Sequence, residues 1–229
     1  MKLKLLPLLL AATAFATACG DDDDSTGPQG EARVRIVNIA PTAGQIDLLL
    51  DGNIIEEDVP YPFATAYEDV GAGDRNVEVR PTGTTTAIIV GDVALSDGES
   101  HSLLVAGPED DLRVDVLEDD LTAPTGGKAK VRLIHGAPSA GSVDIYVSAP
   151  GEALSASDRI VTGAAFGAFL DYIEVDPGDY EVRITPTGSL TPVVDEQISL
   201  SSGDIRTAIA VETAGGGAPF DALILDDTD

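Results

Sequence analysis

The sequence has no Trp, a single Cys and two His among its 229 residues. One Cys cannot form an intramolecular disulfide, and two His with no second Cys cannot complete a structural zinc site. Basic residues are also scarce, because 13 Lys and Arg stand against 40 Asp and Glu and give a net charge of −27. This charge would repel a phosphate backbone, so the sequence predicts no nucleic-acid partner.

Sequence motifs of common catalytic and nucleotide-binding sites are missing as well. There is no phosphate-binding glycine loop, nucleotide fingerprint or nucleophile elbow. His101 lies between two serines, but neighbours in a strand point to opposite faces, so this arrangement is not a nucleophile–base pair. The acidic clusters at residues 109–111, 118–120 and 226–227 lack the spacing of a calcium loop, which leaves weak Ca²⁺ binding as an alternative. We expect no enzyme activity, no cofactor and no metal centre.

The N-terminus carries an export signal. Residues 1–18 begin with Lys2 and Lys4, continue with an apolar stretch too short to span a membrane, and end in small residues like those at a peptidase cleavage site. This is the pattern of a secretory signal peptide. Cys19 follows in the context ATACG, which resembles the bacterial lipobox; lipidation is the favoured interpretation, and a free thiol is the alternative. Residues 19–31 are the lipidated Cys and an acidic tether, which is either a spacer or a sorting signal.

These features predict an exported protein that is lipid-anchored at the bacterial outer membrane or cell surface. Two or three acyl chains anchor a protein stably where one chain does not. The predicted partners are the membrane itself, through the anchor, and an unknown envelope or extracellular molecule.

The chain also contains an internal duplication. Residues 32–50 and 129–147 align without gaps at an offset of 97 residues, and eight of the nineteen positions are identical. We expect this signature to be structural: a strand, a fixed corner at the Pro and Gly, and a second strand. The signature residues are Arg35, Pro41, Gly44 and Asp47 in the first copy and Arg132, His135, Pro138, Gly141 and Asp144 in the second.

Two of these residues invite a functional interpretation. His135 corresponds to Asn38 in the first copy, which hydrogen-bonds but cannot act as a base, so a structural role is favoured. Asp144 and its counterpart Asp47 interrupt an apolar strand, and a buried carboxylate must be paired or hydrogen-bonded. The alternatives are a pair with the signature arginine, hydrogen bonds from loop amides, or a ligand role.

The remaining pattern is that of short strands separated by turns. Val, Ile, Leu and Thr dominate and favour an extended chain, and Asp51-Gly52 predicts a type I′ hairpin turn. Later turns repeat at an offset of 105, so eight residues are inserted, most simply within residues 148–163. Strands are predicted at residues 33–39, 45–50, 53–57, 76–80, 86–95, 100–106 and 113–118, and again at 130–135, 142–147, 169–175, 180–185, 193–200, 205–211 and 221–225.

This pattern predicts an all-β fold of two tandem antiparallel β-sandwiches. The first repeat is expected at residues 32–121 and the second at residues 129–229. Residues 122–128 form a Pro- and Gly-containing linker, which we expect to leave hinge freedom between the domains.

The chain resembles the bacterial domain-of-unknown-function family 4397. That family opens with V-R-V-V-H-A-S-P-D-A-P-x-V-D-V-Y-V, and residues 131–147 read VRLIHGAPSAGSVDIYV. A phenylalanine-led strand and a P-x-G-x-Y-x-V turn of the family look like residues 166–169 and 177–182. The resemblance implies immunoglobulin-like β-sandwiches, often on lipoproteins or secreted proteins, with no established enzymatic activity.

We therefore expect non-catalytic domains that bind or space something at the cell surface. A solute- or carbohydrate-binding module is the alternative, weakened because sugar sites usually need exposed aromatic platforms. A hydrolase is a remote alternative, which would require His135, Asp144 and a Ser within mutual hydrogen-bond reach.

Overall fold

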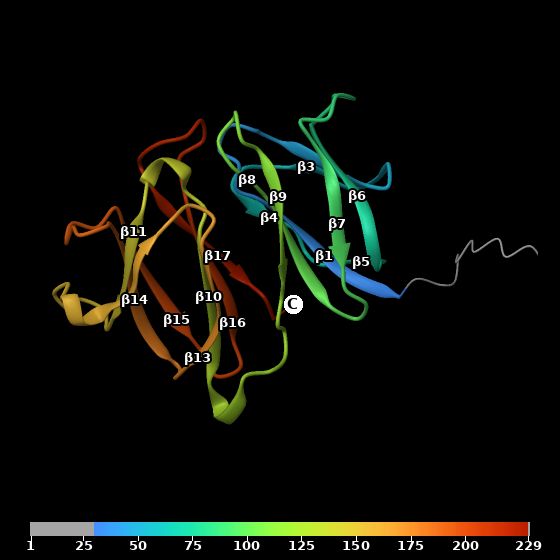
Figure 1. The fold of residues 1–229 in the computed structure, drawn as a ribbon. Coiled ribbons are helices and arrows are strands. Elements are labelled where there is room, and N and C mark those ends of the chain that lie inside the picture. Colours follow the sequence, from blue (N-terminus) through green and yellow to red (C-terminus); the bar gives the residue numbers. More distant parts are fainter. Residues whose placement is uncertain (1–29, 229) are drawn as a thin grey trace, which may run out of the picture.

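The structure, a computed structural model, describes residues 30–228 (Figure 1). This part of the chain contains three short 3₁₀ helices, η1 (Thr125–Gly127), η2 (Pro138–Ala140) and η3 (Ala156–Asp158), and no α-helix. The first-half strands are β1 (Glu31–Asn38), β2 (Ile46–Leu50), β3 (Asn53–Val59), β4 (Phe63–Ala64), β5 (Glu68–Gly71), β6 (Gly73–Pro81), β7 (Ile89–Leu95), β8 (Ser100–Ala106) and β9 (Arg113–Glu118). The second-half strands are β10 (Ala129–His135), β11 (Val143–Ser148), β12 (Arg159–Ala164), β13 (Phe169–Val175), β14 (Gly178–Pro186), β15 (Val194–Leu200), β16 (Ile205–Val211) and β17 (Asp221–Asp226).

Four sheets form two sandwiches, which confirms the predicted all-β fold class. Sheet A has the order β4-β1-β8-β9, with β5 also paired to β1, and packs on sheet B, β3-β2-β6-β7. Sheet C, β13-β10-β16-β17, packs in the same way on sheet D, β12-β11-β14-β15. Each sandwich buries its own aliphatic cluster, as expected for a chain without Trp.

Sheets A and C differ from the prediction in one respect, because they are mixed rather than purely antiparallel. β1 pairs in parallel with β8, and β10 in parallel with β16. A hairpin forces its strands to be antiparallel, but β1 and β8 are joined by a long path through sheet B and have no such constraint.

Most predicted strands are present, and the predicted turn is as well. Asp51 and Gly52 both have positive φ, 49° and 77°, as a type I′ turn requires. In the second repeat a longer loop, residues 149–158, takes the place of this turn and accommodates the inserted residues. β4, β5 and β12 were not predicted, because these edge strands are largely exposed and lack an apolar alternation.

The two sandwiches pack against each other through sheets A and C. A third apolar cluster fills this interface and includes Val37 and Leu104 from the first sandwich and Ile134 and Ile209 from the second. All seven residues of β8 are buried, since this strand has a core on both faces. The predicted hinge freedom is therefore wrong: the linker permits movement, but the buried interface opposes it.

Candidate functional site

The signature forms the same corner in both sandwiches. His135 donates from Nε2 to the Gly141 carbonyl at 2.7 Å, and its Nδ1 accepts from the Ala137 amide at 3.4 Å. In the first sandwich, Asn38 donates to the Gly44 carbonyl at 2.8 Å and accepts from the Ala40 amide at 3.3 Å.

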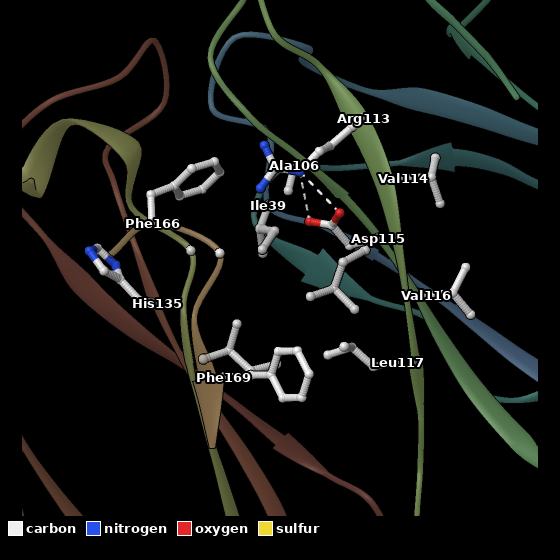
Figure 2. A pocket seen from close by; sticks show the side chains of 14 residues that line it. Ile39, Ala106, Arg113, Val114, Asp115, Val116, Leu117, His135, Phe166 and Phe169 are labelled. Atoms are coloured by element: carbon white, nitrogen blue, oxygen red, sulfur yellow. Dashed lines mark hydrogen bonds and ion pairs between the residues drawn. The ribbon is translucent and has the colours of Figure 1, made fainter. Parts of the chain in front are cut away.

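The two glycines of this corner have φ of 68° (Gly141) and 69° (Gly44), a conformation that favours glycine. Pro138 begins η2, and the carbonyl of Pro41 accepts from the Gly215 amide of the other sandwich at 2.7 Å. His135 thus holds the loop from Ala137 to Gly141. Its imidazole points away from the cavity between the two sandwiches, which Figure 2 shows and which is described below.

His135→Asn will leave stability nearly unchanged, because an amide side chain already performs this task at Asn38. His135→Leu will lower the free energy of unfolding by about 1–3 kcal/mol, because a buried amide and a buried carbonyl lose their partner. Urea denaturation of the two variants measures both values. Equal losses for Asn and Leu would contradict the structural role.

Asp144 is fully buried and is held by main-chain amides, one in the edge strand β12 and one in the turn after β14, and not by Arg132. Its carboxylate accepts from the Gly163 amide at 2.8 Å and the Gly188 amide at 3.1 Å, and pairs with Arg159 at 3.3 Å. Burial by itself raises the pKa of Asp144, but the two amides and Arg159 outweigh it, and the pKa lies below its ordinary value.

Asp47 has the same kind of surroundings in the first sandwich. It accepts from the Asp58 amide at 3.0 Å and from the Thr82 hydroxyl at 2.9 Å. Both carboxylates therefore tie a strand to the neighbouring edge strand and to a turn, and their hydrogen bonds leave the signature arginines to pair elsewhere.

The lowered pKa of Asp144 makes its contribution to stability pH-dependent. The ionised form favours the folded state, so the contribution is complete above the unfolded pKa of about 3.9 and is lost as pH falls through the folded pKa. Asp144→Asn will therefore be more destabilising at pH 6 than at pH 3. Urea denaturation at both pH values tests this, and a difference from wild type that does not change with pH would contradict it.

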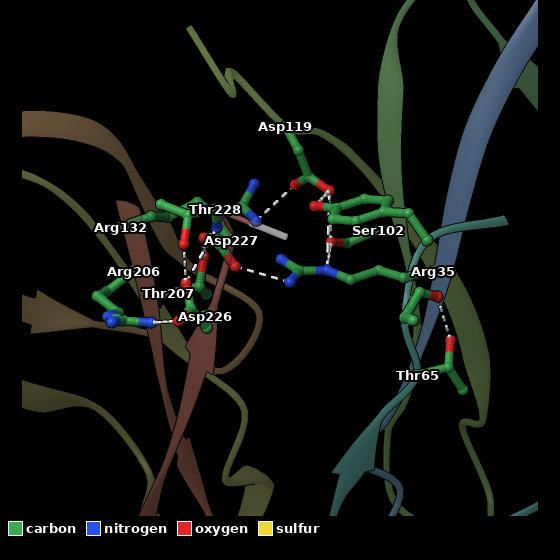
Figure 3. Close-up of polar contacts among 12 residues, drawn as sticks. Arg35, Thr65, Ser102, Asp119, Arg132, Arg206, Thr207, Asp226, Asp227 and Thr228 are labelled. Carbon is green, nitrogen blue, oxygen red and sulfur yellow. Dashed lines mark hydrogen bonds and ion pairs between the residues drawn. The ribbon is translucent and has the colours of Figure 1, made fainter. Parts of the chain in front are cut away.

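The signature arginines meet at the interface between the sandwiches, in a buried network with an approximate two-fold repetition (Figure 3). Arg132 pairs with Asp119 of the other sandwich at 2.5 Å, and Arg35 pairs with Asp227 of the other sandwich at 2.6 Å. All four side chains are at most 3% exposed. Two positive and two negative charges thus compensate each other away from water.

Hydroxyl groups complete each half of this network. Ser102 and Tyr67 both donate to Asp119 at 2.7 Å. The counterparts Thr207 and Tyr172 donate to Asp227 at 2.6 and 2.7 Å. Burial raises the pKa of both tyrosines, so they keep their protons and remain donors.

Each arginine also lies over a tyrosine ring, Arg35 at 4.9 Å from Tyr67 and Arg132 at 4.5 Å from Tyr172. We define the interface network as Arg35, Tyr67, Ser102, Asp119, Arg132, Tyr172, Thr207 and Asp227. Of these residues, only the arginines belong to the duplicated signature. The offset of 105 residues between the two tyrosines was a signal that would have pointed to the others.

A groove opens at one edge of the interface, between β9 and β13. It combines a cavity of about 360 Å³ with an adjoining recess of about 370 Å³, which share Val116, Leu117 and Phe169. Figure 2 shows Phe169 and Leu117 pointing into the space between the two strands. The guanidinium carbon of Arg113 lies 4.6 Å from the centre of the Phe166 ring, and Arg113 pairs with Asp115 at 3.0 Å. We call this region the interdomain groove.

The pseudo-equivalent position on the other side of the interface is closed. There Tyr61, the counterpart of Phe166, donates its hydroxyl to the Glu212 carbonyl of the other sandwich at 2.8 Å. Glu212 is buried, and its carboxylate accepts from the Ser139 and Gly217 amides. On the groove side the counterpart of Glu212 is Gly107, so the carboxylate that accepts the loop amides on the closed side has no equivalent there.

Phe169, the second aromatic residue of the groove, also has no aromatic counterpart on the closed side. Phe169 is 51% exposed, whereas its counterpart Ala64 is small. The open and closed sides thus differ at three positions of two otherwise similar halves. Comparison of the two signature copies gave no sign of it, since none of these residues belongs to the signature.

The catalytic and metal alternatives find no support in this geometry. The side-chain partners of His135 and Asp144 are main-chain groups and Arg159, and within residues 30–228 neither bonds a serine. His101 is buried and its Nε2 accepts from the Ser96 amide at 3.3 Å. Across the same residues, no group of three or more His, Cys, Asp or Glu is arranged to hold a metal ion. Cys19 lies outside the described residues.

Comparison with known proteins identifies the sequence family but leaves the function open. The profile of a domain of unknown function, DUF4397, matches residues 32–146 and 150–229. No curated protein matches the chain.

Several solved structures show low similarity to this chain. Family 41 carbohydrate-binding modules from streptococcal virulence factors are 10% identical, with a TM-score of 0.30 over 83% of this chain and 96% of theirs. The family 26 module from Eubacterium rectale Amy13K is 11% identical, with a TM-score of 0.29 over 87% of this chain and 98% of its own. The C-terminal domain of AlgF from P. aeruginosa is 13% identical, with a TM-score of 0.29 over 44% of this chain and 98% of its own. These values are too low to identify a ligand.

Proposed function

Because this chain belongs to the DUF4397 family, a domain of unknown function, we propose its role from its own geometry. The protein is a non-catalytic, lipid-anchored envelope protein whose two β-sandwiches hold a ligand in the interdomain groove. The observation that supports this role is the asymmetry of the interface, which is closed at Tyr61 and open at Phe169. A groove with an apolar floor, an exposed aromatic ring and a few polar groups is the usual form of a binding site.

The proposed anchor is Cys19, after removal of residues 1–18, and residues 19–31 are the proposed lipidated Cys and acidic tether. Within residues 30–228, no helix is long and apolar enough to cross a membrane. The proposed location is the outer membrane or the cell surface, and the proposed domains are residues 32–121 and 129–229, joined by residues 122–128.

Cys19→Ala will abolish incorporation of radiolabelled palmitate and release the protein from the membrane fraction, because the thiol is the attachment point of the acyl chains. Metabolic labelling followed by fractionation measures both. Unchanged labelling of the variant would refute the anchor while leaving the groove untouched.

The groove is tested with a glycan array and a peptide array probed with the soluble chain that starts after Cys19. Phe169→Ala will weaken binding of any groove ligand at least about tenfold, since a buried aromatic contact is a typical hot spot. Phe63→Ala is the matched control, because Phe63 is 46% exposed and lies outside the groove. A ligand that binds both variants like wild type would place recognition elsewhere.

Carbohydrate binding is a second candidate function. The exposed ring of Phe169, beside Phe166 and the Arg113–Asp115 pair, supplies a platform and polar groups of the kind that sugars use. A positive glycan that requires Phe169 would support it.

A further inference from the structure

The wall of the interdomain groove on the β9 side carries more acidic than basic side chains. Asp115, Glu118 and Asp120 line it and Asp120 pairs with Lys130, whereas β9 contributes a single Arg. That arginine, Arg113, is already shared between Asp111 and Asp115. Glu118 on this wall and Asp171 on the opposite wall are exposed and line the recess. The groove therefore attracts a cationic ligand and repels an anionic one.

The same wall presents a free strand edge. β9 pairs only with β8 among the described strands. The Asp119 amide donates to the Ser100 carbonyl, so the alternation of an antiparallel ladder directs the main-chain groups of Val114, Val116 and Glu118 away from β8. Of these, the Glu118 carbonyl accepts from Arg132 at 3.3 Å. β9 has no Pro, Lys or bulge that would protect this edge against pairing.

The main chain of this edge lines the groove. Val114 and Val116 border the cavity, although their side chains pack in the core of the first sandwich. Figure 2 shows both side chains pointing away from the cavity. Their contribution to the cavity wall is therefore made by amide and carbonyl groups, which an extended ligand can pair with.

The floor of the groove is apolar, with Ile39, Leu104 and Leu117 facing Phe169 across the cavity. A β-strand places alternate side chains on opposite faces, so one set of its side chains can contact this floor while the other set meets the carboxylates. We propose that the groove binds an extended polypeptide segment with alternating apolar and basic residues, which adds as a strand to the free edge of β9. This inference rests on the proposed function and specifies its ligand.

The test uses capped eight-residue peptides added to the soluble chain that starts after Cys19, followed by isothermal titration and by the amide NMR signals of Val114, Val116 and Glu118. A Lys/Val alternating peptide is expected to bind and shift these signals. A Glu/Val peptide is expected to bind at least about tenfold more weakly. Two isomers of the Lys/Val peptide, N-methylated either at all Lys or at all Val, carry equivalent side chains but block opposite edges of the strand. Only one of them is expected to bind.

Two double variants separate groove electrostatics from total charge. Glu118→Gln/Asp171→Asn is expected to weaken Lys/Val binding about tenfold. Glu57→Gln/Asp69→Asn removes the same charge from exposed positions outside the groove and is expected to leave binding unchanged. Circular dichroism checks that all four substitutions, which are at the surface, leave the fold intact.

Equal binding of the Lys and Glu peptides, or of the two methylated isomers, would overturn strand addition. If no peptide binds but a glycan binds in a Phe169-dependent manner, the proposed function stands and this inference fails. If neither peptides nor glycans bind through Phe169, both fail.

Discussion

Asp119→Asn will lower the free energy of unfolding by about 3–5 kcal/mol, the typical cost of removing one partner from a buried ion pair. Asp119 accepts from Arg132, Ser102 and Tyr67 in a fully buried position. A neutral amide in its place leaves Arg132 charged and without compensation in the interface. Urea denaturation followed by circular dichroism, which suits a protein without Trp, measures the loss.

The repetition of the network supplies an internal control. Asp227 makes the corresponding contacts with Arg35, Thr207 and Tyr172, so Asp227→Asn is expected to cost about as much. Asp110→Asn, at an exposed position, is expected to change stability by less than about 0.5 kcal/mol. A loss below about 1 kcal/mol for both buried aspartates would show that the network does not hold the sandwiches together.

Ile209→Ala will cost about 2–5 kcal/mol, because Ile209 is fully buried between sheets A and C and the smaller side chain leaves a cavity. This effect distinguishes a packed pair of sandwiches from two independent ones. If the sandwiches moved freely on the linker, Ile209 would lie on a solvent-facing side of sheet C, and the substitution would change stability by less than about 0.5 kcal/mol.

Calorimetry gives a second measure of the same interface. The wild-type protein is expected to unfold in one transition, since the two sandwiches share a core, and Ile209→Ala is expected to broaden or split it. Ile54→Ala is the control, because Ile54 is 50% exposed. Two separate transitions in the wild-type protein would contradict the shared core.

The acidic partners of the signature arginines could not be predicted from the local sequence pattern. Arg35 and Arg132 alternate with apolar residues, and the nearest acidic candidates in the pattern were Asp47 and Asp144. The actual partners, Asp119 and Asp227, come from the ends of distant strands and from the other sandwich. An ion pair across an interface depends on how two folded units pack together. The spacing of residues within one unit therefore cannot predict it.

The sequence by itself determined the all-β class and the duplication, and it predicted a structural role for His135. Those features depend on alternation of residue types, on turn residues and on comparison of two copies, all of which are local. It also contained the lipobox-like context of Cys19, which the described residues do not reach.

Only the tertiary structure decided that the sandwiches share a core and that the interdomain groove is open on one side alone. The open side is lined by β9 and Phe169, and the closed side is bridged by Tyr61 and Glu212; in each case residues far apart in the sequence come together only across the interface. Whether a cavity remains there is set by the volume of side chains from two folded units, and that volume is defined only once they pack.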